Sequence, residues 1–230
     1  MRKLTFTFAV AFCLTKALAG EDHLEPSTPW WYSDEQTKVM QVIFKEAWGN
    51  DVRTRTFVEL GGLALPKTEI TLLTNASGHY RIIDLSVPIM LMNYRAAHRD
   101  FELKLAERYH TKSILPPDFH TLKVTRCEVE ISPTLGKRIL AVWRDMMLRT
   151  RYFKNAVHPA MDAGWIDYWM SDTEQSFAGT IPTSYSEPMT AKFSDLSYDM
   201  QTYCAAKSKA SLGQLDKDVS DLARLEQQNK

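Results

Sequence analysis

The sequence lacks the short motifs that mark many nucleotide-binding, hydrolytic and zinc-dependent enzymes. It contains no G-x-S-x-G, no G-x-G-x-x-G, no P-loop pattern and no H-E-x-x-H. No two of its six histidines lie four residues apart on an expected helix. His158 and Asp162 have that spacing, but Pro159 argues against a helix there. We therefore predict no catalytic residue, no metal ligand and no cofactor.

Long apolar runs are also absent after residue 20, so we expect no transmembrane segment in the processed chain. The chain opens with Arg2 and Lys3, an apolar run over 4–14 and an A-x-A pattern at 17–19. This layout is typical of a cleavable secretory signal. We predict that residues 1–19 are a signal peptide and that the protein is exported, to the periplasm or beyond. A retained anchor and an ordinary first strand are the alternatives.

Cysteine is scarce, and removal of Cys13 with the signal would leave only Cys127 and Cys204. An even number of cysteines in an exported protein suggests a disulfide bond. Cys127 alternates with apolar residues as on one face of a strand, and Cys204 continues the apolar stripe of a helix. We predict a Cys127–Cys204 disulfide, with two buried unpaired thiols as the alternative. The absence of C-x-x-C disfavours a redox enzyme.

Neither sign of charge predominates, with 28 Lys and Arg against 28 Asp and Glu. We therefore do not expect a general nucleic-acid-binding protein. The charge is unevenly distributed, because residues 93–154 carry 13 basic and 7 acidic residues. Residues 155–203 carry 7 acidic residues and only Lys192 as a base. Two neighbouring elements with complementary surfaces would explain this, and so would a basic face for an anionic partner.

The pattern of apolar residues predicts an α+β fold with mainly antiparallel strands. One hairpin is expected early in the chain, over 68–87, and another late, over 164–182. The regular alternation of strands and helices of a doubly wound α/β protein is missing. A further strand should carry Cys127. Helices are expected over 33–48, 88–108, 132–150 and 190–204.

The expected organisation is a single domain with a loose segment at each end. We assign 20–32 to a flexible leader because it is polar and carries two prolines. Residues 33–210 should form the α+β domain, and 211–230 a terminal helix or tail. The apolar residues of this tail repeat over less than two heptads, which is too short to predict a coiled coil. It is either a docked or frayed helix or a small oligomerisation handle, and the oligomeric state stays open.

The stretch "MDAGWIDYWMSD" over 161–172 is the most unusual in composition. As a strand it would place Trp165, Asp167 and Trp169 on one face and an ordinary core set on the other. The first face could be covered like the second, or it could be an aromatic binding surface with the two indoles as anchors. An acid/base active site is a weaker interpretation, since Asp167 has no identifiable carboxylate partner.

A resemblance covers roughly residues 126–204. A tryptophan-bearing helix ending "LRTRY", an Asp-x-Gly loop, an aromatic strand, a turn with Gly and Pro and a last helix ending "TYC" resemble a group of small exported proteins of Gram-negative bacteria. In that group Asp and Gly are adjacent, whereas Ala163 separates them here. The resemblance implies export and the Cys127–Cys204 pairing, and nothing about activity.

From these patterns we expect a non-catalytic protein-binding or accessory, inhibitor-like module of the cell envelope. Its partner would be an envelope or secreted protein, bound through the aromatic strand or the basic central helices. The alternative is an envelope enzyme that acts on glycan or cell-wall substrates.

Overall fold

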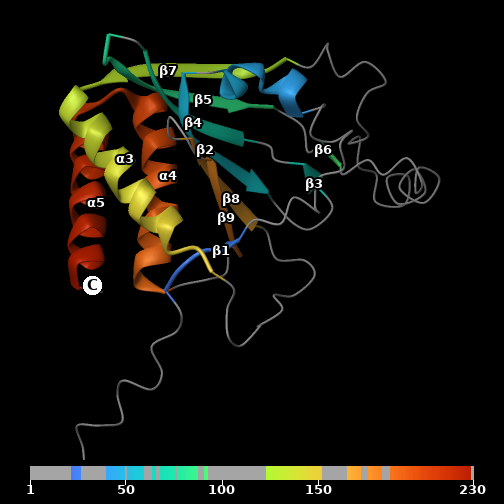
Figure 1. The fold of residues 1–230 in the computed structure, drawn as a ribbon. Helices are drawn as coiled ribbons and strands as arrows, with labels where there is room; N and C mark the ends of the chain where they lie inside the picture. The colour runs from blue at the N-terminus through green and yellow to red at the C-terminus, as the bar shows by residue number, and fades with distance from the viewer. Residues whose placement is uncertain are drawn as a thin grey trace, which may run out of the picture.

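The computed structural model describes residues 22–26, 40–49, 51–59, 64–65, 68–75, 77–87, 91–92, 123–151, 165–171, 176–182 and 187–228. These residues form an antiparallel sheet with two long helices packed against one face and a third long helix packed against those two (Figure 1). The predicted α+β class is confirmed. The helices are α3 (Pro133–Leu148), α4 (Pro188–Ala206) and α5 (Lys209–Gln228).

The large sheet has seven strands in the order β1-β9-β8-β2-β4-β5-β7, and every neighbouring pair is antiparallel. The strands are β1 (Glu25–Pro26), β2 (Val52–Glu59), β4 (Thr68–Thr74), β5 (Tyr80–Ser86), β7 (Thr125–Ile131), β8 (Trp165–Ser171) and β9 (Ser176–Pro182). Both predicted hairpins are therefore present, as β4–β5 and β8–β9. The first turns at Gly78, whose φ of 75° is a conformation that glycine adopts without strain.

One expected helix begins differently. Leu91–Met92 form the short strand β6, which pairs with β3 (Ala64–Leu65) in a separate two-stranded sheet. The prediction of a helix starting at Pro88 is thus wrong for these residues, because a short apolar run such as "IMLM" fits a strand as well as a helix. The rest of the predicted helix lies outside the described residues.

Helix α3 lies within the predicted range 132–150, and α4 extends two residues beyond the predicted range 190–204 at each end. Ser132 caps α3, since its hydroxyl accepts a hydrogen bond of 3.2 Å from the backbone N–H of Leu135. α4 ends at Lys207, which has a left-handed backbone conformation, with φ 48°. Ser208 then caps α5 by accepting a 3.1 Å hydrogen bond from the N–H of Ser211. A single residue pair therefore turns the chain between the two helices.

The main hydrophobic core lies between the helices and the sheet. Its centre is Trp143 of α3, which makes edge contacts with Phe193 of α4 and Tyr168 of β8 at centroid distances of 4.8 and 5.9 Å. All three side chains are almost completely buried. The predicted stripes of α3 and α4, and the face of β8 that carries Ile166, supply most of this core.

A second, smaller core covers the opposite face of the sheet. A helical turn at 40–43 and the 3-10 helix η2 (Lys45–Trp48) lie across it. Phe44 is completely buried there among apolar side chains of β4 and β5. The sheet is therefore covered on both faces at its centre. The start predicted for this first helix, at Ser33, lies outside the described residues.

The Cys127–Cys204 disulfide is present and ties β7 to α4, with Cα atoms 5.9 Å apart. The cysteine periodicities thus identified two inward-facing positions correctly. Cys204 is completely buried in the main core, where Cys127 packs against it.

Part of the expected flexible leader belongs to the folded domain. β1 adds an edge strand to β9, with Glu25 opposite Thr180. Leu24 is completely buried in the main core, and the carboxylate of Asp22 accepts hydrogen bonds from the first backbone N–H groups of α4. The polar composition of 20–32 gave no indication of this packing. One buried leucine and one capping carboxylate are nevertheless enough to anchor five residues.

The C-terminal segment packs on the domain as helix α5, which begins at Lys209, so the predicted boundary at 210/211 falls inside it. Leu215, Val219 and Leu222 are completely buried in the main core. Three of the five leucine and valine residues of 211–230 are thus completely buried, and the other two, Leu212 and Leu225, are partly buried against the same core.

Candidate functional site

A cluster of charged and aromatic side chains lies on the second face of the sheet, and we call it the Arg55 cluster. It consists of Trp48, Arg55, Glu69, Asp167 and Trp169. Arg55 of β2 is directly opposite Trp169 of β8. Glu69 of β4 and Asp167 of β8 are both opposite Phe57, two residues further along β2. Directly opposed residues share a face, so four strand residues converge beside Trp48 of η2.

Arg55 is the centre of the cluster and is only 6% exposed. Its guanidinium carbon lies 4.0 Å from the ring centre of Trp48 and 3.8 Å from that of Trp169. These are cation–π contacts, which partly offset the loss of water around a buried cation. Burial lowers the pKa of Arg55 to about 10, opposed by the charge of Glu69. The side chain therefore stays positively charged at neutral pH.

The hydrogen bonds of Arg55 are incomplete. Among the described residues, its Nε and Nη1 atoms are buried and donate to no acceptor. Nor do Arg55 and Glu69 form an ion pair within 4.0 Å. Buried guanidinium groups are normally saturated with acceptors, so this arrangement is unusual.

Glu69 is completely buried next to Arg55. Its Oε1 accepts a 3.5 Å hydrogen bond from the hydroxyl of Thr71, while Oε2 is buried without a partner in the described structure. Burial raises the pKa of Glu69 well above its ordinary value, and the charge of Arg55 and the Thr71 hydrogen bond only partly oppose this rise. Burial therefore disfavours the ionised form of this carboxyl group.

The predicted binding surface maps onto this cluster in part. Asp167 is 7% exposed and Trp169 is half-buried, both on the second face. The alternating residues Ile166, Tyr168 and Met170 are buried toward the helices, as expected. The side chain of Trp165 lies outside the described structure. The strand is thus covered around Asp167, while binding through Trp165, Asp167 and Trp169 stays a prediction.

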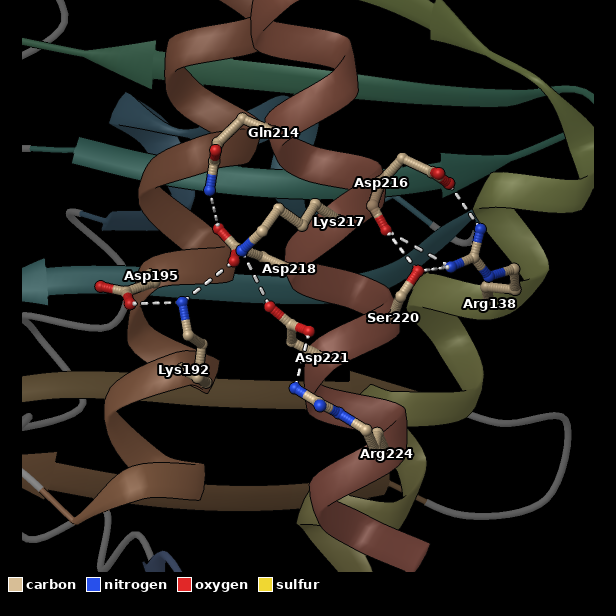
Figure 2. Close-up of polar contacts among 10 residues, drawn as sticks. All are labelled: Arg138, Lys192, Asp195, Gln214, Asp216, Lys217, Asp218, Ser220, Asp221 and Arg224. Atoms are coloured by element: carbon tan, nitrogen blue, oxygen red, sulfur yellow. Dashed lines mark hydrogen bonds and ion pairs between the residues drawn. The ribbon is translucent and has the colours of Figure 1, made fainter.

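A second polar cluster fastens α5 to α4 and α3 (Figure 2). Asp218 of α5 is 2% exposed and accepts hydrogen bonds from Lys192 at 3.0 Å and Gln214 at 2.7 Å. Its carboxyl group also contacts that of Asp199 on α4. On the other side of α5, Arg138 of α3 binds Asp216 and Ser220. This cluster joins helices to one another, and its acids are already paired within the chain.

The two contacting carboxyls of this cluster differ in acidity. Burial first, and then contact with Asp218, raise the pKa of Asp199 to about 7. Burial opposes ionisation of Asp218 as well, but hydrogen bonds from Asp199, Gln214 and Lys192 lower its pKa to about 2. Asp199 therefore holds the proton that the pair shares. Because this contact joins α4 to α5, its titration changes the stability of the fold with pH.

Asp84 is a further buried acid, 9% exposed on β5 beside the disulfide. It accepts a 3.3 Å hydrogen bond from Gln201 of α4. Burial raises the pKa of Asp84 to about 6, with the Gln201 hydrogen bond opposing the rise. It lies on the helix side of the sheet, away from the Arg55 cluster.

In the described parts of the chain, no group of three or more His, Cys, Asp and Glu side chains could hold a metal ion. No helix among the described residues is both long enough and apolar enough to span a bilayer. Comparison with known proteins adds no assignment, since no protein-family model, curated protein or solved structure matches the chain.

Sequence reasoning found two members of the Arg55 cluster and missed three. Asp167 and Trp169 stood out because the aromatic strand is unusual in composition. Arg55 and Glu69 were missed because alternation assigns charged positions in a strand to solvent. A usable signal was nonetheless present, since Glu69 lies in "TEITLLT", a strand apolar enough to be buried on both faces.

Proposed function

We propose that this protein is an exported, non-catalytic binding module of the bacterial cell envelope, and that the Arg55 cluster forms part of its binding surface. One observation supports this most. Two half-buried indoles, Trp48 and Trp169, flank a buried cation whose donors the described residues leave unused. Tryptophan and arginine are the residues that most often dominate binding interfaces.

The partner we propose is an envelope or secreted protein. The test is a pull-down from the envelope fraction of the native host, with the oxidised chain as bait. A Trp165→Ala, Trp169→Ala variant should fold and lose the partner. Tyr198→Ala is the matched control, because Tyr198 is 42% exposed on α4, on the helix side of the sheet.

Equal capture by all three baits would contradict a binding role for the aromatic strand. If the double variant does not fold, Trp169→Gln alone replaces it, because Trp169 is only half-buried and a polar side chain can reach solvent there. Circular dichroism and a thermal melt of each bait establish folding before the capture is compared.

The alternative is an envelope enzyme acting on glycan, and one relationship favours it. Glu69 and Asp167 are in register on the two strands beside β2, so their backbones are about 10 Å apart, near the separation of a glycosidase acid/base pair. Complete burial of Glu69 argues against it, since a catalytic acid must reach the substrate. The enzyme alternative would be supported if the wild type cleaves purified peptidoglycan and the Asp167→Asn variant does not.

Export itself is tested by the mature N-terminus. We expect N-terminal sequencing of the protein recovered from the periplasm or medium to begin at Gly20, two residues before the Asp22 that caps α4. A chain that keeps Met1 would contradict export through a cleaved signal.

A further inference from the structure

Arg55 carries buried donors that its neighbours do not use. The side chain is 6% exposed, and Nε and Nη1 find no acceptor. Buried donors without partners are rare in folded proteins, and an absent ligand is one cause of them. Glu69 is the acid whose charge acts on Arg55, but its carboxyl oxygens do not come within 4.0 Å of the guanidinium nitrogens.

The shape of the group restricts which acceptor fits. All five N–H bonds of a guanidinium lie in its own plane, and indole rings lie against this one at 4.0 and 3.8 Å. An acceptor must therefore approach along the plane, at an edge. Nε–H lies beside an N–H of Nη2 at one edge, and Nη1 lies beside Nη2 at the end of the group. At either place a planar group with two oxygens can accept two parallel hydrogen bonds, one from an unused donor and one from Nη2, as in an arginine–carboxylate pair.

Glu69 does not occupy the unused donors of Arg55. Burial raises the pKa of Glu69 and so disfavours the ionised form that would pair with the guanidinium group. Its Oε1 accepts its hydrogen bond from the hydroxyl of Thr71 instead. The donors of Arg55 are therefore left for an acceptor from outside the cluster.

We propose that the Arg55 cluster binds a carboxylate group of a ligand, through in-plane hydrogen bonds from Arg55, with Trp48 and Trp169 against the ligand's apolar body. This proposal rests on the proposed function, because it names the chemical group that the same binding surface would recognise. The carboxylate belongs either to a small free acid or to a peptide chain terminus of the partner.

The direct test follows the Arg55 Nε–H resonance in ¹⁵N-labelled oxidised protein during titration with acetate at constant ionic strength. Sodium chloride and sodium sulfate are the matched anions. We expect a saturable shift with acetate and none with chloride or sulfate. Arg55→Met should weaken binding at least about tenfold, read from tryptophan fluorescence, as loss of a charged hydrogen-bond donor does. Arg53→Met, which removes an arginine from the same strand, should leave binding unchanged.

Two peptide probes separate the sources of the carboxylate. N-acetyl-Ala-Ala with a free carboxylate and its C-terminal amide differ only in that group. Tighter binding of the free acid than of acetate, with no binding of the amide, supports a chain terminus. Binding of acetate alone supports a small acid.

A Nε–H resonance that responds to neither acetate nor the peptide, or responds equally to sulfate, overturns the inference. That reading uses the wild type, so it holds even if Arg55→Met does not fold. If carboxylate binding is absent but partner capture depends on Trp165 and Trp169, the proposed function stands and the carboxylate inference does not. If the protein binds carboxylates but captures no protein, the carboxylate inference stands and the proposed function does not.

Discussion

Gly136 of α3 lies directly against the ring of Tyr80 on β5, with no room for a methyl group between them. A Cβ atom at position 136 would overlap three atoms of the ring. Tyr80 is 8% exposed and belongs to the main core, so the ring cannot simply move into solvent. This contact sets how closely α3 approaches the sheet.

We therefore expect Gly136→Ala to lower the free energy of unfolding by about 1–3 kcal/mol, the usual cost of overpacking a core. Chemical denaturation measures it. Gly213→Ala is the matched control, because Gly213 lies inside α5 with nothing within 4 Å of an added Cβ. That change should stabilise by about 0.5–1 kcal/mol through helix propensity. A neutral Gly136→Ala would show that α3 is not held at this distance.

The disulfide should contribute a large share of the stability. Cys127 and Cys204 are 77 residues apart, and closing a loop of this size stabilises by roughly 4 kcal/mol in the chain-entropy model. We expect the Cys127→Ala, Cys204→Ala variant to unfold at a correspondingly lower urea concentration. Reduction of the wild type should have the same effect. Cys13→Ala should change nothing, since the signal peptide would carry that residue away.

Stability should fall as the pH rises from about 4 to 7. Folding raises the pKa of Asp199 from 3.8 to about 7, so its contribution is full below pH 3.8 and is lost as the pH passes 7. Asp84, with a pKa of about 6, acts in the same direction. Folding lowers the pKa of Asp218, so its effect on stability has the opposite pH dependence, and its contribution is lost as the pH falls through about 2.

Asp199→Asn should flatten this fall, because an amide donates to Asp218 at every pH. Thermal melts from pH 4 to 8 measure the slope. Asp216→Asn is the control, since it removes a charge on the other side of α5, where Asp216 binds Arg138, and leaves the contact between Asp199 and Asp218 in place. An unchanged slope in Asp199→Asn would show that the proton is held elsewhere, for example on Glu69 or Asp84.

The N-terminal segment should stabilise α4 from a distance. Asp22 accepts hydrogen bonds of 2.7 and 2.8 Å from the N–H groups of Met189 and Thr190. Asp22→Ala removes this cap and should cost about 0.5–2 kcal/mol in denaturant unfolding. Asp22→Asn should cost less, because it keeps an acceptor. Glu187→Ala should be near neutral, since Glu187 is the N-cap residue but makes no side-chain cap bond.

Local pattern was sufficient for much of the fold. Short-range chemistry specifies the strand around Cys127, the hairpin over 68–87 and the helix over 132–150, and all three are present. The same reasoning went wrong at Leu91–Met92, where an apolar run fits two structures. It also left Asp22 and Leu24 in a loose leader, because their partners lie more than 120 residues away in the chain.

By itself the sequence determined the two hairpins, the strand that carries Cys127 and the helices α3 and α4, and that two cysteines face inward, because these depend on neighbours within a few residues. Only the tertiary structure decided which charges are buried. Arg55 and Glu69 carry the same local signal as solvent-facing residues, and they become a buried cation and a buried acid of raised pKa once η2 covers the second face of the sheet. Burial depends on what packs from elsewhere in the chain, and desolvation then sets the chemistry of each group.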